Sequence, residues 1–141
     1  KKNMRRFSFF IILFLFLNNI LFMQSLKSND FENVKIISCY DGDTCTSSEG
    51  EKIRLACIDT PEIRGNKINP EEALQAKEFL NSKVKGKYVS LKRITTDRYD
   101  RVVGELFVNK INIQKLLYQK GFAKIYKKYA YQCPWTSNYI K

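Results

Sequence analysis

The sequence predicts an α+β fold that is mainly β: a five-stranded barrel of the oligonucleotide-binding (OB) type with two helices. Three observations lead to this prediction. Short apolar stretches rich in β-branched residues recur along the chain, turn residues separate them, and one stretch with helical spacing interrupts them after the third. Short strands interrupted in this way are typical of small closed barrels.

The strands are predicted over residues 34–39, 44–46, 52–58, 88–94 and 102–108. Turn-forming residues separate the first three, with Asp-Gly-Asp at residues 41–43 and Ser-Ser-Glu-Gly at residues 47–50. The third strand shows the clearest alternation, because Ile53, Leu55 and Cys57 recur at every second position.

Two helices are predicted. The first begins near Pro70, since proline is tolerated in the first helical turn, and Glu71 and Glu72 suit the positive helix start. The second covers residues 113–120 and ends at Gly121. The tail that follows is basic and aromatic, and its rings are more commonly explained by packing than by stacking on bases.

Residues 1–28 are typical of an export signal, because a basic start precedes an almost wholly apolar run over residues 7–23. The apolar run also approaches the length that spans a bilayer, so an uncleaved membrane anchor is the alternative. In both cases the positive start orients the domain at residues 29–141 outside the cytoplasm. We therefore expect a periplasmic or secreted protein, or one anchored on the outer side of the membrane through residues 7–23.

The composition restricts the chemistry. The chain has no histidine, which excludes Ser-His-Asp and Cys-His catalysis and histidine-ligated zinc. The formal net charge of +11 favours a polyanionic partner such as nucleic acid, although charge alone is a weak indicator.

The four cysteines contain no CxxC pair, so a zinc ribbon is not expected. Export makes disulfides feasible, and four cysteines permit three pairings among which the sequence does not choose. We favour Cys39–Cys45, which flank the turn at residues 41–44, together with Cys57–Cys133. Four buried free thiols are the alternative.

Two acidic clusters flank the third predicted strand and indicate a cation site. Asp43 and Asp59 lie at junctions of strands and loops, and two such carboxylates with a backbone carbonyl and waters form a ligand set that suits Ca²⁺. Glu62 follows a proline that stiffens its loop, and a glutamate near a metal-bound water can accept a proton or orient the attack. Taken alone, the Asp-Gly-Asp turn more often only makes a hairpin.

Arg54 stands just before the second acidic cluster, and Arg101 closes the sequence Asp-Arg-Tyr-Asp-Arg at residues 97–101. Guanidinium groups pair strongly with phosphate, and two of them with a cation can stabilise the charge of a phosphoryl transition state. Surface ion pairs are the alternative for both arginines. The pattern as a whole predicts a site that cleaves phosphodiesters.

At these residues the chain resembles the staphylococcal-nuclease-like (thermonuclease) family, over about residues 34–131. The motifs that carry the resemblance are DGDT at residues 41–44, RL at 54–55, IDTPE at 58–62, DRYDR at 97–101 and GFAK at 121–124. They occur in family order and with near-family spacing. The resemblance implies a five-stranded barrel with helices and Ca²⁺-dependent hydrolysis of DNA and RNA. We expect a monomer with no obligate protein partner.

The resemblance also implies residue roles near the cation. Asp43 and Asp59 would be metal ligands, and Thr60 would supply a backbone carbonyl. Glu62 takes the place of the residue assigned as general base or as the group that orients water.

A second set of implied roles concerns the nucleic acid. Arg54 and Arg101 would hold the scissile phosphate and stabilise the transition state. Arg98 and Tyr99 would contact a nucleotide's terminal phosphate and ring, and Tyr129 falls near a base-stacking tyrosine of the family.

The chain departs from the family pattern in two places. Asp100 stands where the family usually has glycine, and there it could pair with Arg101 and compete with phosphate. The family's third, C-terminal helix is also expected to be missing. Two other functions stay open at this stage: a catalytically silent OB-fold module that binds nucleic acid, and a membrane-anchored structural protein whose basic surface binds anionic lipid. Silent modules usually lose the acidic and arginine residues, which this chain keeps.

Overall fold

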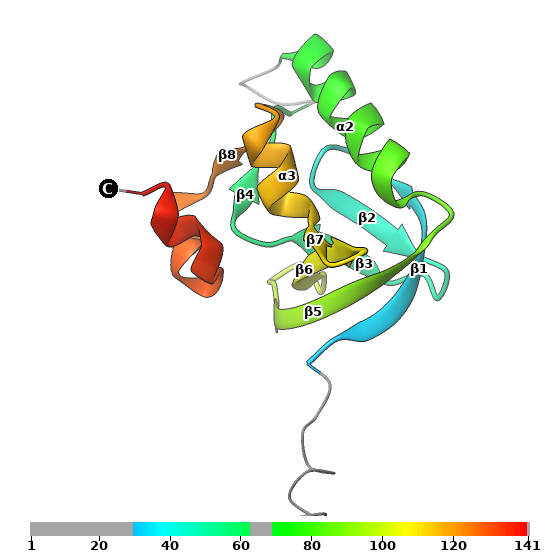
Figure 1. Cartoon of the computed structure of the whole chain (residues 1–141). Coiled ribbons are helices and arrows are strands. Elements are labelled where there is room, and N and C mark those ends of the chain that lie inside the picture. The colour runs from blue at the N-terminus through cyan, green and yellow to red at the C-terminus, as the bar shows by residue number, and fades with distance from the viewer. Residues whose placement is uncertain (1–29, 63–68, 141) are drawn as a thin grey trace, which may run out of the picture. The chain divides into compact units, whose positions relative to one another are not determined.

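The computed structural model describes residues 30–62 and 69–140, and its elements are labelled in Figure 1. The segment expected to be an export signal or anchor, residues 1–28, lies outside this part of the chain. Within the described ranges, no helix is both long and apolar enough to cross a membrane.

A curved sheet forms the body of the domain. Its strands are β1 (Glu32–Cys39), β2 (Thr44–Ser47), β3 (Lys52–Leu55), β5 (Tyr88–Thr96), β6 (Val102–Val108) and β7 (Ile111–Asn112). They follow the order β3-β2-β1-β5-β6-β7 with antiparallel neighbours, and a parallel pairing of β3 with β6 closes the barrel. The closed ring consists of β1, β2, β3, β6 and β5, and β7 pairs with β6 outside it. The predicted mainly-β barrel of five strands with two helices is confirmed.

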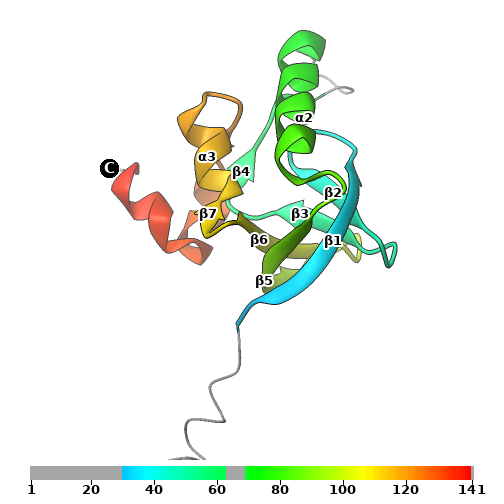
Figure 2. The same ribbon diagram turned by 45° about the vertical axis from the view of Figure 1, so that its right-hand side comes forward.

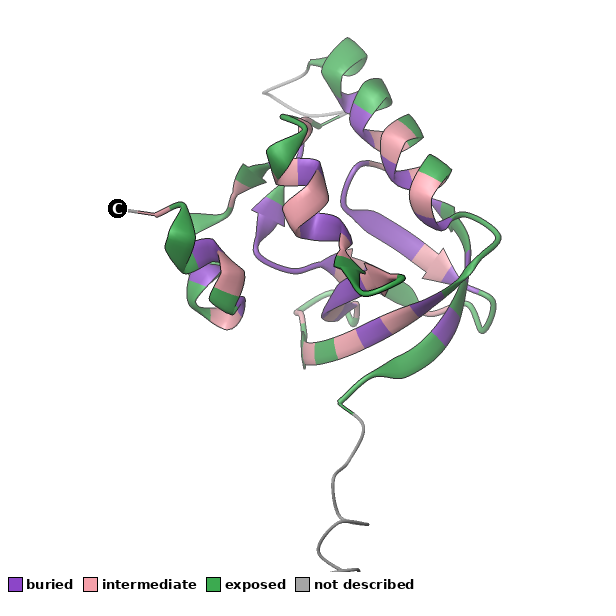
Figure 3. Cartoon of the chain, viewed as in Figure 1, coloured by how far each residue is buried: buried purple, intermediate pink, exposed green. Residues whose placement is uncertain are grey.

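The barrel interior is filled by the inward side chains of its strands. Ile36, Ile53, Leu91 and Leu106 are completely buried there, one from each of β1, β3, β5 and β6. Figure 3 shows buried residues alternating with more exposed ones along β5. Each such aliphatic side chain contributes roughly 1.5–3 kcal/mol through removal from water, which makes this core the main support of the sheet.

Two α-helices lie at one end of the barrel in both views (Figures 1 and 2). They are α2 (Pro70–Val84), which packs against β1, and α3 (Ile113–Gln119), which packs against β6 and β7. Asn69 and Asn112 cap them by accepting a hydrogen bond from the backbone N–H three residues on. These bounds confirm the two predicted helices.

The third predicted strand, residues 52–58, is wrong beyond Leu55. The chain leaves the sheet at Ala56 and turns at Cys57, whose φ of 65° is left-handed. Ala56 is completely buried, as is Leu55 before it, so the alternation required of a strand stops there. A short strand β4 (Ile58–Asp59) follows and pairs with β8 (Lys124–Ile125) in a separate two-stranded sheet.

Both favoured disulfides are present. Cys39 is bonded to Cys45, and Cys57 is bonded to Cys133. The described cysteines are therefore all paired, and the alternative of free thiols is wrong.

The tail after β8 forms two 3₁₀-helices, η1 (Lys127–Gln132) and η2 (Pro134–Asn138). Trp135 packs against the core, and its Nε1 donates a hydrogen bond to Oε1 of the buried Glu105 at 2.9 Å. No α-helix follows α3 in residues 120–140.

Candidate active site

The turn between β1 and β2 holds Asp43. Its neighbour Gly42 is packed so closely that a Cβ there would lie 2.8 Å from the Cβ of Ala76 and 2.9 Å from the Cβ of Thr60. Asp41 closes the turn by accepting a hydrogen bond from the backbone N of Asp43 at 3.0 Å. The turn is therefore pressed between α2 and the Thr60 segment, and only glycine fits at its centre.

The Asp43 carboxylate is buried, and both of its oxygens have partners. Thr60 donates to Oδ2 from its backbone N at 3.2 Å and from its hydroxyl at 3.0 Å, while Thr44 donates to Oδ1 at 3.3 Å. Nη2 of Arg54 lies 3.1 Å from Oδ2. Burial raises the pKa of Asp43 to about 6, although the charge of Arg54 opposes the rise. The ionised carboxylate is therefore not fully compensated by this one guanidinium.

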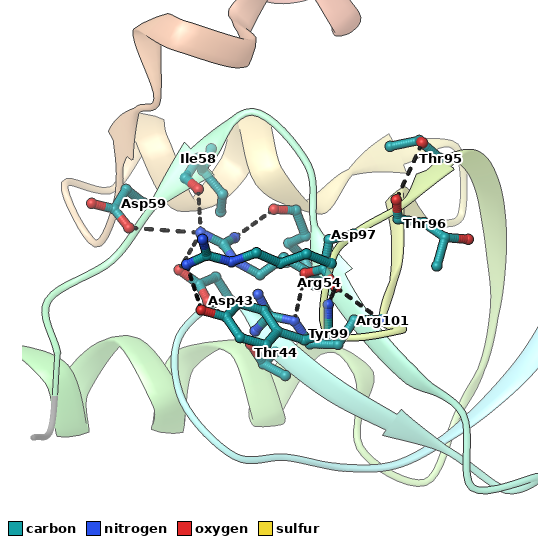
Figure 4. Close-up of polar contacts among 12 residues, drawn as sticks. Asp43, Thr44, Arg54, Ile58, Asp59, Thr95, Thr96, Asp97, Tyr99 and Arg101 are labelled. Atoms are coloured by element: carbon teal, nitrogen blue, oxygen red, sulfur yellow. Dashed lines mark hydrogen bonds and ion pairs between the residues drawn. The ribbon is translucent and has the colours of Figure 1, made fainter.

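Arg54 is the centre of this cluster. It lies in β3 directly opposite Thr44 of β2, and its guanidinium folds over the turn that follows. Nη1 donates to the Leu55 carbonyl at 2.6 Å, and Nη2 donates to the Ile58 carbonyl at 2.9 Å. Nη2 also lies 3.6 Å from Oδ1 of Asp59. Both carboxylates that were predicted as metal ligands thus meet one arginine (Figure 4).

The same arrangement shows whether a cation would suit the site. Asp43 and Asp59 share a single positive charge, and Asp41 adds negative potential at Asp43. Across residues 30–62 and 69–140 no three acidic or cysteine side chains cluster as a metal centre, so the side chains supply two carboxylates. Oxygen donors of this kind, with coordination positions left for carbonyls, water and substrate, fit a hard divalent cation such as Ca²⁺.

The loop between β5 and β6, residues 97–101, is organised by Asp97. Its Oδ1 accepts hydrogen bonds from the backbone N of Tyr99 at 2.9 Å and of Arg101 at 3.0 Å, and its Oδ2 accepts one from Nε of Arg101 at 2.8 Å. Partial burial pushes the pKa of Asp97 up, but these hydrogen bonds outweigh it and hold that pKa below its ordinary value. Asp97 therefore stays ionised and fixes the side chain of Arg101.

The expected pairing of Asp100 with Arg101 is wrong, because Asp97 takes this role. Asp100 has a φ of 62°, in the left-handed region that favours glycine and that aspartate tolerates better than most residues. The glycine expected at this position is thus explained by the backbone, and the aspartate is a tolerated replacement.

An open cleft of about 590 Å³ is lined by Arg54 and by residues 97–99 and Arg101 of the loop between β5 and β6. We call Asp43, Arg54, Asp59 and Thr60 the inner site, and residues 97–101 the outer loop. The described side chains that line the cleft include Arg54, Ile58, Arg98, Tyr99, Arg101, Tyr126, Lys128 and Tyr129. Its volume lies in the range of sites for small ligands, so it suits a short stretch of a polymer.

Aromatic rings with cations beside them stand on two walls of the cleft. The Tyr99 ring is 63% exposed, and the guanidinium carbons of Arg98 and Arg101 lie 4.7 Å and 5.4 Å from its centroid. On the other wall, Nζ of Lys128 lies 5.2 Å from the centroid of Tyr129. Rings flanked by cations can stack on bases while the cations attract the phosphates between them.

The structure brings most of the predicted site residues together. Asp43, Arg54, Asp59 and Thr60 meet in the inner site, Arg98, Tyr99 and Arg101 share the outer loop, and Tyr129 lines the cleft. Glu62 is exposed and adjoins the undescribed residues 63–68, and, like Asp43, Asp59 and Thr60, it is not among the described residues that line the cleft.

Three residues of the cleft and the outer loop, Asp97, Tyr126 and Lys128, have positions that the sequence motifs do not predict. The sequence does contain an indication for Asp97, because an aspartate at the start of a polar turn often accepts a hydrogen bond from the backbone N–H two residues later. Tyr126 and Lys128 had only the basic, aromatic composition of the tail, because a short 3₁₀-helix has no long periodic pattern that would place them.

Comparison with known proteins identifies the family. The family described as "Staphylococcal nuclease homologue" matches residues 52–139. The chain is 32% identical over 111 residues to an uncharacterized protein of Bacillus anthracis, covering 74% of this chain and 52% of that protein. It is 31% identical over 111 residues to an "uncharacterized endonuclease" of Haemophilus influenzae, covering 76% and 60%. It is 29% identical over 104 residues to a "probable staphylococcal-like nuclease" of Oryza sativa subsp. japonica, covering 74% and 26%.

The chain thus spans between 52% and 60% of the length of the two bacterial relatives. The family match begins in β3 and takes in Arg54, Asp59, the outer loop and η1. The barrel, the two carboxylates that meet Arg54 and the arginines that share one cleft agree with that match, and the chain belongs to the staphylococcal nuclease homologue family.

Proposed function

We propose that this protein is an exported, Ca²⁺-dependent nuclease that hydrolyses phosphodiester bonds of DNA and RNA. The observation that carries the proposal is the convergence of Asp43 and Asp59 on Arg54, which lines the same cleft as Arg101. Both parts can assist hydrolysis of a phosphodiester, because carboxylates hold a hard cation and guanidinium groups stabilise the charge on the phosphate. Family membership supports the proposal, since relatives carry the names endonuclease and nuclease.

Asp43 and Asp59 would hold the cation, together with the backbone carbonyl of Thr60 and water. When bound, Ca²⁺ would polarise a phosphoryl oxygen and offset the negative charge that develops there. Thr60 has a second task in the protein itself, because its hydroxyl and backbone N fix the orientation of the Asp43 carboxylate.

The arginines would hold the scissile phosphate. Asp97 engages Arg101 through Nε, so a phosphate can take the two Nη groups in a fork-like contact. In Arg54 the contact to Asp59 is the longer of its two ion pairs, at 3.6 Å against 3.1 Å to Asp43. A phosphate oxygen would compete for this guanidinium on the side of Asp59.

Glu62 would accept the proton of the attacking water as the water oxygen bonds to phosphorus and the bond from phosphorus to the leaving sugar oxygen breaks; that oxygen would take its proton from solvent water. An exposed glutamate whose loop is stiffened by the preceding Pro61 suits this task, because its carboxylate is open to water and to substrate. The tyrosines of the two walls, Tyr99 and Tyr129, would stack on unpaired bases on either side of the reacting phosphate.

Export is supported by two features of the chain. The basic start and apolar run at residues 1–28 resemble a signal, and two disulfides form readily only in an oxidising compartment.

Hydrolysis of single-stranded DNA and RNA oligonucleotides by the full chain tests the function, with Ca²⁺ and with a chelator. We expect cleavage with Ca²⁺ and none with the chelator, while circular dichroism shows the protein folded in both. Glu62→Gln should lower turnover by about 10²–10⁴-fold without a change in the dichroism spectrum. A folded protein that binds oligonucleotides tightly in Ca²⁺ but does not cleave them would favour the silent binding module instead.

A further inference from the structure

Each disulfide holds one part of the proposed site. Cys39 and Cys45 lie directly opposite each other in the pairing of β1 with β2, and only residues 40–44 connect them. This short closed turn contains Asp43. A covalent link across its base keeps the two strands from spreading, so it limits the positions that Asp43 can take.

Helix α2 anchors the same turn from outside. Oδ1 of Asn81 accepts a hydrogen bond from the backbone N of Cys39 at 2.9 Å, and its Nδ2 donates to the Cys39 carbonyl at 3.1 Å. Gly42 packs closely on Ala76 of the same helix. The disulfide and α2 thus fix the turn from two sides, and both supports end at the backbone that carries Asp43.

The other disulfide holds a different element. Cys57 lies in the turn that follows Arg54 and β3, and Cys133 directly follows η1. From η1, Lys128 and Tyr129 line the cleft. The disulfide therefore ties the wall that carries them to the turn beside the inner site.

Noncovalent contacts also support that wall, within η1, where Thr136 donates to the Ala130 carbonyl at 2.8 Å, and at its two ends. Before η1, strand β8 pairs with β4 over two residues only. After Cys133, Trp135 donates to the buried Glu105, which also accepts a hydrogen bond from Asn112 at 2.6 Å. Cys57–Cys133 is the covalent tie between these two noncovalent supports.

We propose that the two disulfides are positioning elements with separate tasks. Cys39–Cys45 sets the affinity for the divalent cation through Asp43, and Cys57–Cys133 sets the affinity for single-stranded nucleic acid through η1. This rests on the proposed function, because it takes Ca²⁺ and nucleic acid as the two ligands. Sγ of Cys57 lies 3.4 Å from the carbonyl of Tyr129, a residue proposed to stack on bases, so each disulfide would govern binding and leave the chemistry to other residues.

Two double variants of the full chain test the proposal: Cys39→Ser with Cys45→Ser, and Cys57→Ser with Cys133→Ser. Calorimetry measures Ca²⁺ binding without nucleic acid, and fluorescence anisotropy measures the binding of a labelled single-stranded DNA oligonucleotide in a chelator. The first variant should weaken Ca²⁺ binding about ten- to hundredfold and leave oligonucleotide affinity within about twofold. The second should weaken oligonucleotide binding about tenfold and leave Ca²⁺ affinity within about twofold.

Circular dichroism shows whether each double variant is folded. If the Cys39/Cys45 variant does not fold, Asn81→Ala replaces it, and if the Cys57/Cys133 variant does not fold, Trp135→Phe replaces it. Both substitutions keep the two disulfides and remove hydrogen bonds of the neighbouring supports. Asn81→Ala should then weaken Ca²⁺ binding alone, and Trp135→Phe should weaken oligonucleotide binding alone.

Equal losses of both ligands in both variants, or unchanged affinities in both, would overturn the separate tasks. A wild-type protein that binds neither ligand would refute the proposed function and this proposal with it. A wild-type protein that binds both ligands, with variants that bind them equally well, would refute the positioning proposal alone.

Discussion

The inner site and the outer loop each contain an aspartate paired with an arginine, yet the two pairs behave in opposite ways. Burial raises the pKa of Asp43 to about 6 despite Arg54, whereas hydrogen bonds from Arg101 and its loop lower the pKa of Asp97 despite partial burial. The difference shows that an ion pair does not by itself decide the charge state of a carboxyl group. The inner pair still lacks positive charge, which suits a cation site, while the outer pair is satisfied and holds a geometry.

Breaking the inner pair should have the largest effect. Arg54→Ala would leave the Asp43 carboxylate buried without the guanidinium that pairs with it. We expect the free energy of unfolding to fall by about 3 kcal/mol and hydrolysis to be lost. Arg93→Ala is the matched control, because its ion pairs with Glu32 and Glu51 lie at the surface and should contribute about 1 kcal/mol or less. Urea unfolding measures both, and equal losses would contradict the role given to burial.

Breaking the outer pair from the arginine side should affect catalysis and spare the fold. We expect Arg101→Ala to lower kcat about 10²–10³-fold, because the transition state loses a charged donor, while the free energy of unfolding changes by about 1 kcal/mol or less. Arg98→Ala, in the same loop, should mainly raise KM, by about tenfold or less. Steady-state kinetics on single-stranded DNA separates the two, and similar losses of kcat would remove the distinction between these arginines.

The opposite pKa shifts predict opposite dependences of stability on pH. Because the pKa of Asp43 is raised from 3.8 to about 6, the folded protein binds more protons there than the unfolded chain. In the metal-free protein this group should lower the free energy of unfolding as pH rises from about 4 to about 6, by an amount on the order of 1–3 kcal/mol. The lowered pKa of Asp97 acts the other way, since its contribution is present above pH about 4 and is lost on acidification.

Urea unfolding between pH 4 and 7 in a chelator measures these slopes. Asp43→Asn should abolish the decline between about pH 4 and 6 and leave the loss at lower pH in place. A decline of the same size in that variant would show that another group causes it.

Removing the charge of Asp97 should have a smaller effect than removing Arg101. Asp97→Asn keeps an acceptor for the loop but weakens the contact to Nε of Arg101, so we expect kcat to fall about tenfold through misplacement of the guanidinium. A double-mutant cycle checks this, because Asp97→Asn should cost little further activity once Arg101 is alanine. Additive losses would mean that Asp97 acts independently of Arg101.

The smallest effect is expected at Asp100. Asp100→Gly should change the free energy of unfolding by less than about 1 kcal/mol, since glycine gains the left-handed conformation but loses more freedom on folding. Asp100→Val should destabilise the protein by about 1–2 kcal/mol, because a β-branched residue does not tolerate that conformation. Thermal unfolding compares the two, and equal midpoints would contradict the conformational explanation.

The inner site was easier to predict from the sequence than the outer loop. The inner site lies within local motifs, so Asp43, Asp59 and Thr60 could be placed at turns and strand ends from the sequence alone. The partner of Arg101 could not, because Asp97 and Asp100 both lie close to it and only the backbone conformation decides between them. The end of β3 was also hidden, because Ala56 and Cys57 are compatible with a strand until their burial and dihedral angles are known.

The parallel pairing of β3 with β6 has a consequence for when the site can exist. Arg54 lies opposite Val103 in that pairing, and the two are roughly fifty residues apart along the chain, so the barrel closes only after a long loop has been ordered. Hairpins form from neighbouring residues: β1–β2 carries Asp43 and β2–β3 brings Arg54 beside it, whereas Arg101 directly precedes β6 and joins Arg54 through the β3–β6 pairing. Under the proposed function, the two arginines of the cleft would therefore come together only when the barrel closes.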